Sequence, residues 1–510
     1  MNERIGFDTD KYLKYQVKKL SERLHRFERL YLEFGGKLLS DLHASRVLPG
    51  YRPAAKTELL KKLKEMDLFY CVSAEDVAKG RIRGDSGLTY DLQTIKEIDE
   101  IINLGLNVSG VVISFFADQP AALQLRRKLE NLGIKTFIQK RIDGYPNDMT
   151  KILKGYEKQP YIKPEKKLVV VTGTGPGSGK MAFCLSQIYQ ERKKGLKSGF
   201  AKFETFPIWN LTLNHSVNIA YEAATADLWD INGVDPFHLK EYKIKAINYN
   251  RDIENFAILK KLLKEITGEE HPFGYKSPTD MGINMAYEGI INDKICRQAA
   301  KQEIIRRYFR YHKERVEGKE TSETTDRIDG IMRKTKLKPT DRRVVFPARQ
   351  AAKEAEKTGK GFDGIYCGAA LELKDGRIIT GKNSAVLHAE SAAVLNAIKI
   401  LADIPDKIDL ISPNILREIS EMKGNLVDKR SPSLTVNETL IALAAASAVN
   451  PSAKAAMDVI GRLRNCEMHV TLFSPVKEKF YHKLPSGGDE IGLRILSINL
   501  TTDVNTDILP

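Results

Sequence analysis

The stretch VVVTGTGPGSGKMAFCLSQ, residues 169–187, decides the fold of the middle of this chain. Branched apolar residues and a threonine predict a buried strand, and a glycine-rich turn then leads into a helical pattern that starts near Lys180. A strand, a glycine turn and a helix in this order are typical of phosphate-binding loops, in which backbone N–H groups and a lysine surround phosphate oxygens. The stretch therefore predicts a P-loop-like α/β unit over residues 161–252.

Two positions depart from the usual pattern of glycine, four residues, glycine, lysine and serine or threonine. Thr174 stands where the first glycine is required, and Met181 stands where a hydroxyl would bind Mg²⁺. The rest of the loop can still expose several N–H groups, and its cofactor-binding candidates, with Lys180, are Gly175, Gly177, Ser178 and Gly179. Two interpretations stay open: a site for ATP, whose Mg²⁺ is held by a carboxylate from elsewhere, or a structural glycine turn.

The next strand, SGFAKFETF from residue 198, carries two further candidates. Lys202 and Glu204 lie on one side of it by the two-residue alternation of strands. They stand near its carboxyl end, where ligands bind in open α/β sheets. This arrangement is similar to the dethiobiotin synthetase branch of P-loop proteins, in which a Thr-Gly-Thr loop precedes the helix and a lysine-bearing strand follows it. We therefore expect Lys180, Lys202 and Glu204 to act in catalysis.

The segment after this strand, residues 207–242, is dense in carboxylates and histidines. Asp227 is our fourth catalytic candidate, because a carboxylate here could supply a Mg²⁺ ligand or a general base. The same carboxylates could equally serve as helix caps and surface ion pairs. Both interpretations of Asp227 remain open at the level of the sequence.

The first part of the chain carries candidates for binding a small anionic substrate. His43 and Arg46 lie in or beside one loop, and Arg81 and Arg83 lie in another. Two arginines in one short loop suit an anionic ligand bound through bidentate contacts, although solvated loop charges are the more frequent explanation.

Alternating helical and strand patterns predict an α/β protein of several domains with mostly parallel strands. We expect a Rossmann-like α/β domain over residues 1–160, adjoining the unit at 161–252, then a helical basic segment over 253–340 and a C-terminal α/β domain over 341–510. The five cysteines form no Cys-x-x-Cys pair, so most are expected to be small buried residues. The sequence has no signal peptide or membrane-spanning stretch, so we expect a cytoplasmic protein without a membrane partner and, in addition, a homo-oligomer.

The basic segment contains KQEIIRRYFRYHKER, residues 301–315, in which arginines alternate with aromatic residues. Such a pattern could follow a nucleic-acid backbone and stack on bases. At helical spacing, however, the same residues give an apolar stripe and a solvated basic face, so nucleic acid is not the expected partner.

The C-terminal domain opens with two strands around Lys374-Asp375-Gly376, a hairpin turn, and a helix that begins near His388-Ala389-Glu390. This order resembles the first half of a zinc-dependent nucleoside deaminase and suggests a cytidine-deaminase-like topology. The Pro-Cys-x-x-Cys of such enzymes is absent, and Cys466 with His469 is the nearest substitute. Zinc is therefore not the expected cofactor, and the domain could instead form a dimer surface or a lid.

Ten short motifs together resemble a widespread family of uncharacterised bacterial proteins of about 500 residues. The resemblance covers nearly the whole chain, most densely residues 1–310. The motifs are IGFDTDKYL, YLEFGGKL, HASRVLPGY, RIRGDSGLTYD, GPGSGKM, KFETFPIWNL, YEAATADL, DPFHLKEY, NYNRD and SPTDMGIN. Members have been labelled ATP-dependent peptidases, yet this sequence has no His-Glu-x-x-His and no Gly-x-Ser-x-Gly. The resemblance implies that Met181 belongs to the family pattern and that His-Ala-Glu does not.

Three functional hypotheses follow from the sequence. The first is an enzyme of ligation or phosphoryl transfer that binds ATP on the loop from Gly175 to Lys180. The second is a non-catalytic nucleotide sensor or assembly scaffold that kept the loop without the metal hydroxyl. The third is a zinc-dependent hydrolase in the C-terminal domain.

Overall fold

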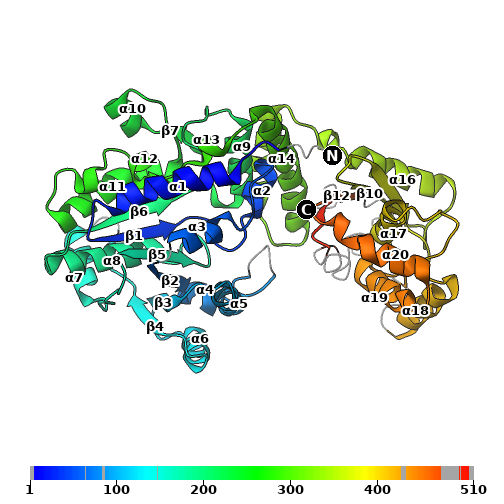
Figure 1. The fold of residues 1–510 in the computed structure, drawn as a ribbon, viewed down its shortest axis with the longest axis horizontal. Helices are drawn as coiled ribbons and strands as arrows, with labels where there is room; N and C mark the ends of the chain where they lie inside the picture. The colour runs from blue at the N-terminus through cyan, green and yellow to red at the C-terminus, as the bar shows by residue number, and fades with distance from the viewer. Residues whose placement is uncertain are drawn as a thin grey trace. The chain divides into compact units, whose positions relative to one another are not determined.

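The structure is a computed structural model. It describes residues 5–63, 65–82, 87–145, 148–426, 432–471, 493 and 496–504. The chain divides into two compact units, Asn2–Ala300 and Lys301–Pro510. Both combine helices with a sheet, as predicted (Figure 1).

The sheet of the first unit is parallel throughout and, in the described part of the chain, contains seven strands. In spatial order they are β4 (Thr136–Lys140), β3 (Val108–Phe116), β2 (Met66–Ser73), β5 (Leu168–Gly173), β1 (Arg29–Phe34), β6 (Ser198–Phe203) and β9 (Gly282–Ile283). Two short strands, β7 (Asn232–Val234) and β8 (Ile247–Tyr249), form a separate antiparallel pair. Parallel strands need crossover connections, and the helices between them provide these.

The strands that the sequence places in two adjoining α/β units are interleaved in one sheet. β1 lies between β5 and β6, and its Glu33 is in register with Lys202 of β6. β2 pairs with β5 on the other side, so strands from before and after residue 160 alternate in the middle of the sheet, in the order β2, β5, β1 and β6. The sequence does not reveal this order, because the residues of an apolar strand such as LVVV do not indicate which strands it will pair with.

The helices of the first unit follow the predicted alternation, and several of them pack on the sheet (Figure 1). They are α1 (Thr9–Leu24), α2 (Leu42–Val47), α3 (Ala55–Leu63), α4 (Ala74–Ala78), α5 (Tyr90–Asn103), α6 (Pro120–Asn131), α7 (Met149–Lys158), α8 (Lys180–Lys193), α9 (Ser216–Ala224), α10 (Pro236–Tyr242), α11 (Asn250–Thr267), α12 (Pro278–Met281) and α13 (Ala286–Gly289). The next helix, α14 (Asp293–Val316), runs on past residue 300. Within the described ranges, no helix has the length and apolarity needed to cross a membrane.

The spacing of Leu13, Val17, Leu20, Leu24 and Phe27 predicts an amphipathic helix at the start of the chain, and α1 confirms it. Tyr12, Leu13 and Leu20 are fully buried along one side of α1, because apolar residues at three- and four-residue steps share a helix face. The Asp8 side chain caps the helix by accepting a hydrogen bond from the Lys11 backbone N–H at 2.9 Å. The cysteine prediction is confirmed as well: all five are free, and four are buried.

The second unit is built on a four-stranded sheet, as far as the described residues go, in the order β11 (Ile378–Lys382), β10 (Gly368–Glu372), β12 (Glu467–Val470) and β13 (Asn499–Thr502). The predicted hairpin joins β10 to β11, and Gly376 has a φ of 87° in its turn. Its other helices are α15 (Ser322–Thr335), α16 (Val345–Lys357), α17 (Ala389–Leu401), α18 (Pro413–Leu426), α19 (Val436–Ser447) and α20 (Pro451–Val459). The cytidine-deaminase-like topology stays a prediction.

The basic helix α14 differs from the expectation of a solvated basic face. Arg306 and Arg307 are buried, at 8% and 9% exposure, and both bind the carboxylate of Glu303 at 2.6 and 2.8 Å. Glu303 stands three and four residues before them, so all three side chains share one side of the helix. The expectation was wrong because it judged the arginines by their charge and overlooked a buried partner one turn away.

Candidate functional site

The glycine loop lies where the carboxyl end of β5 meets the start of α8. Gly173 and Gly179 have no room for a side chain: a Cβ on Gly173 would come within 2.3 Å of the Cys71 carbonyl, and one on Gly179 within 2.5 Å of Ser114. Gly177 and Gly179 also have positive φ values, 76° and 90°. Packing and backbone conformation therefore explain these three glycines without any ligand.

Gly175 is different. Its φ is not in the left-handed region, and a Cβ there would meet only the Tyr90 hydroxyl, at an ordinary contact distance of 3.6 Å. Neither strain nor crowding therefore requires a glycine at this position. Close approach of a ligand to the backbone is the remaining physical reason for a glycine in such a loop.

Lys180 folds back over the loop as the first residue of α8. Its Nζ donates to the Gly175 carbonyl at 2.9 Å and to the Ser178 hydroxyl at 3.3 Å. The N-cap residue of α8 is Gly179, and no side chain caps the helix. In addition, the Thr174 hydroxyl is buried and has no hydrogen-bond partner among the described residues. An ammonium group and an uncapped helix N-terminus thus meet at the carboxyl edge of the sheet.

Lys202 and Glu204 form a buried polar cluster at the end of β6, and the sequence did not indicate two of its members. The Lys202 ammonium binds Asp252 at 2.6 Å, and the two side chains are only 8% and 12% exposed. The Tyr249 hydroxyl donates to Glu204 at 3.2 Å. Tyr249 ends β8 and Asp252 lies in the first turn of α11, so this short strand and helix complete the cluster.

The two predicted catalytic residues of the cluster, Lys202 and Glu204, differ in how burial and neighbouring charges affect their charge at neutral pH. Burial, with a further contribution from Asp252, raises the pKa of Glu204 to about 7, although Lys202 and Tyr249 act in the opposite direction. Burial also disfavours the charged form of Lys202, but Asp252, Glu204 and Glu33 together hold its pKa above the ordinary value. Lys202 is therefore a permanent cation, whereas Glu204 changes its charge near neutral pH.

Glu33 of β1 is the residue that the sequence reasoning missed. Its Oε2 atom is buried and has no hydrogen-bond partner among the described residues. It stands in register with Lys202, and it contributes to the raised pKa of the Cys71 and Cys184 thiols, which lie on β2 and α8. Glu33 therefore lies between the glycine loop and the Lys202 cluster. A charged residue near the end of the apolar run RLYLEF was the available signal.

The charges around Lys202 do not balance. Three carboxylates, those of Asp252, Glu204 and Glu33, act on its one ammonium group, which leaves a charge of 2− when all are ionised. Excess negative charge in a buried site is relieved either by protons or by a bound cation. The raised pKa of Glu204 shows the first of these responses.

The structure places Asp227 on the 3-10 turn η1 (Ala226–Leu228), where this residue is exposed. Asp230, which is 1% exposed, instead binds Arg251 through two hydrogen bonds of 2.5 and 2.9 Å. That pair fixes the start of α11, and with it the neighbouring Asp252. A catalytic role for Asp227 stays a prediction.

The predicted substrate-binding residues approach the sheet edge from two sides. His43, on α2 together with Arg46, packs edge-on against Phe206 at a ring distance of 5.0 Å, just beyond Glu204. Arg81 binds Asp76 at 3.3 Å and lies over the ring of Tyr90 at 5.6 Å, so it stands beside Gly175. Arg83 lies outside the described residues.

The candidates of the C-terminal domain are engaged in packing and hydrogen bonds. His388 is the N-cap residue of α17, and Glu390 is buried in its first turn. Burial raises the pKa of Cys466 to about 11. His469 shares a hydrogen bond of 3.0 Å with Thr501. In the part of the chain that the structure describes, no group of three or more His, Cys, Asp or Glu side chains is arranged to hold a metal.

Comparisons with known proteins cover nearly the whole chain. Residues 5–336 match the family profile "Domain of unknown function DUF1846, N-terminal", and residues 340–506 match its C-terminal counterpart. A UPF0371 protein of Clostridium tetani (strain Massachusetts / E88) is 47% identical over 503 residues, which cover 98% of this chain and 97% of the relative. A UPF0371 protein of Clostridium botulinum (strain Alaska E43 / Type E3) is 46% identical over 505 residues, 98% of each chain.

Proposed function

This chain belongs to the DUF1846 family, and we propose that it binds a phosphate-bearing nucleotide, with ATP as the leading candidate, on the loop from Gly175 to Lys180. The observation that carries the proposal is Gly175. It has an ordinary backbone conformation and open space, so its missing side chain is best explained by a ligand that approaches the backbone closely.

Lys180 would neutralise phosphate charge. Its ammonium group donates to the Gly175 carbonyl and the Ser178 hydroxyl. A phosphate oxygen is a stronger partner than either, because it carries charge, so the lysine would exchange these bonds for the ligand. The first N–H groups of α8, whose N-terminus has no side-chain cap, would bind further phosphate oxygens.

Glu33 fits a divalent cation that would accompany the nucleotide. Met181 offers no oxygen at the usual position, whereas Mg²⁺ in proteins is commonly held by one or two carboxylates together with phosphate oxygens and water. Glu33 has a buried oxygen atom without a partner in the described part of the chain, and the Lys202 cluster carries excess negative charge. The Glu33 carboxylate would therefore replace the missing hydroxyl.

The reaction class that suits these groups is phosphoryl transfer or ATP-dependent ligation. Glu204 has a pKa of about 7, the range in which a carboxylate can accept a proton from an attacking group at physiological pH. Lys202 would stabilise charge that develops beside it. A small anionic second substrate would bind near Arg81, which stands beside the loop through Tyr90.

Calorimetric titration of ATP, with and without Mg²⁺, tests the proposal. We expect binding by the native protein and at least about tenfold weaker binding by Lys180→Ala. Lys197→Ala, an exposed lysine beyond the other end of α8, is the matched control and should bind as the native protein does. The proposal fails if the native protein does not bind ATP, or if Lys180→Ala binds it equally well.

Met181 also favours the second candidate function, a nucleotide sensor without turnover, because it removes the hydroxyl that usually holds the metal. Incubation with ATP, Mg²⁺ and a panel of small carboxylic acids separates the two functions. Product formation that depends on Glu204 supports the enzyme. Nucleotide binding with no product over hours supports the sensor.

A further inference from the structure

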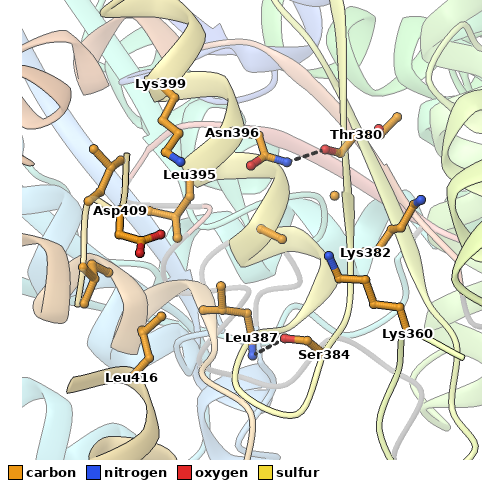
Figure 2. Close-up of a pocket in the computed structure, with 14 residues that line it drawn as sticks. Lys360, Thr380, Lys382, Ser384, Leu387, Leu395, Asn396, Lys399, Asp409 and Leu416 are labelled. Atoms are coloured by element: carbon orange, nitrogen blue, oxygen red, sulfur yellow. Dashed lines mark hydrogen bonds between the residues drawn. The ribbon is translucent and has the colours of Figure 1, made fainter. Parts of the chain in front are cut away.

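A pocket of about 370 Å³ lies in the second unit and is lined by none of the candidate site residues that the sequence suggested (Figure 2). Its walls come from strand β11, helix α17, the segment around residues 409–411 and the start of α18. The side chain of Asn450 fixes that segment by donating to the carbonyls of Asp409 and Leu410, at 3.1 and 3.3 Å. The volume falls within the range of small-molecule sites.

One part of the pocket is apolar. The aliphatic side chains that line it are Leu387, Leu395, Leu410, Ile411 and Leu416. α17 packs directly on β11 at Gly381, where a Cβ would come within 2.3 Å of the Ala393 backbone nitrogen. Because α17 and β11 pack so closely here, the apolar surface of the pocket is formed by the leucine and isoleucine side chains around them. This surface can accept the hydrocarbon part of a ligand.

The charged groups of the pocket are mainly positive. Three lysines and one aspartate line it, and Lys382 is paired with Glu354 at 2.8 Å. Figure 2 shows the ammonium groups of Lys360 and Lys399 on opposite sides of the pocket, with Asp409 on the side of Lys399. Lys360 has no ion-pair partner among the described residues, so the positive charge is least compensated at its end.

Lys399 and Asn396 give the pocket fixed polar groups. The Lys399 ammonium donates to the Asp406 carbonyl at 2.7 Å, which positions it and leaves further N–H groups for a ligand. Asn396 is held by a hydrogen bond of 2.9 Å to the Thr380 carbonyl. Positioned polar groups next to apolar side chains fix the orientation of a ligand in such a pocket.

We propose that this pocket binds a small organic anion, in which a phosphate or carboxylate head group lies near Lys360 and an apolar body lies against the leucines. Asp409 disfavours a second negative charge at the Lys399 end, so the ligand carries its charge at one end only. The site is separate from the glycine loop, which belongs to the other unit. It does not depend on the nucleotide proposal.

Ligand-observed saturation-transfer NMR on the full-length chain tests this inference. All variants carry Lys180→Ala, so that the glycine loop cannot contribute to phosphate binding. Two probes are aromatic anions that differ in their head group, phenyl phosphate and phenylacetate. Benzyl alcohol serves as a probe without charge, and inorganic phosphate serves as a probe without an apolar body. The pocket variant is Lys360→Ala with Lys399→Ala, and the control is Lys353→Ala with Lys407→Ala, two exposed lysines outside the pocket.

We expect one or both aromatic anions to bind more tightly than benzyl alcohol and inorganic phosphate, with binding weakened about tenfold in the pocket variant and unchanged in the control. The anion that binds more tightly shows whether the pocket prefers a phosphate or a carboxylate head group. Lys360 and the two control lysines are exposed, whereas the Lys399 side chain is only 14% exposed. Equal melting temperatures check that the double variant folds, and Lys360→Ala alone, at an exposed position, provides the same test if it does not. Equal affinity in the pocket variant and the control, or no binding of either anion, overturns the inference.

Discussion

Lys202 and Asp252 form a buried ion pair, with Nζ and Oδ2 2.6 Å apart, that joins the end of β6 to the first turn of α11. Fifty residues separate the two in the chain. The pair holds an ammonium group at the sheet edge next to Glu204, and through α11 it ties the segment after β6 to the sheet. The candidate site therefore depends on a contact that the sequence does not indicate.

Asp252→Asn should destabilise the first unit by about 1–3 kcal/mol, because the Lys202 ammonium would lose its charged hydrogen-bond partner while Glu204 and Glu33 still compensate its charge. Urea unfolding followed by tryptophan fluorescence measures the loss, since both tryptophans, Trp209 and Trp229, lie in this unit. Glu254→Gln, two residues further along α11 and exposed, is the control and should change stability by less than about 0.5 kcal/mol. Equal losses in the two variants would show that the pair contributes nothing specific.

Glu204→Gln should flatten the pH dependence of stability. The folded-state pKa of Glu204, about 7, lies above the value near 4.3 of an unfolded glutamate, so the folded state binds the extra proton between these values. Its contribution to stability is therefore fully present below about pH 4.3 and is lost as the pH rises through 7. Unfolding free energies between pH 5 and 8 measure this slope. Parallel curves for the variant and the native protein would contradict the assignment, and Glu265→Gln, exposed on α11, serves as control.

Gly175→Ala and Gly179→Ala separate ligand binding from packing. Gly175→Ala should leave stability within about 0.5 kcal/mol of the native value, because its Cβ meets only an ordinary contact, yet weaken ATP binding about tenfold. Gly179→Ala should destabilise the unit by at least about 1–3 kcal/mol, since it combines a φ of 90° with a clash against Ser114. Melting curves and calorimetry on both variants check this contrast. An unstable Gly175→Ala, or one that binds ATP normally, would remove the reason for assigning a ligand to the loop.

Glu303→Gln should loosen α14 locally, because two buried arginines would lose their carboxylate. Removing one member of a buried charge cluster typically costs about 3–5 kcal/mol. Hydrogen exchange of peptides from residues 301–316, read by mass spectrometry, should rise well above that of the native protein. Glu356→Gln, exposed on α16, is the control. Unchanged exchange in Glu303→Gln would mean that the arginines are solvated after all.

Much of the fold is readable from local patterns, because these depend on neighbouring residues alone. The periodicity of residues 13–27 predicts α1, and Asp375-Gly376 predicts the hairpin between β10 and β11, since a turn and a helix face are formed within a few residues. The glycine loop and the pairing of Lys202 with Glu204 on one side of a strand are predicted in the same way.

The sequence by itself determined the class of the protein, an α/β chain with a glycine loop between a strand and a helix, and the local positions of Lys180, Lys202 and Glu204. Only the tertiary structure decided that β1 lies between β5 and β6, which brings Glu33 beside Lys202, and that α11 supplies Asp252. It also decided that Glu303 forms buried ion pairs with Arg306 and Arg307 of α14. Strand order and buried charge pairing arise from contacts between distant segments, and an apolar strand carries no local mark of the neighbour it will pair with.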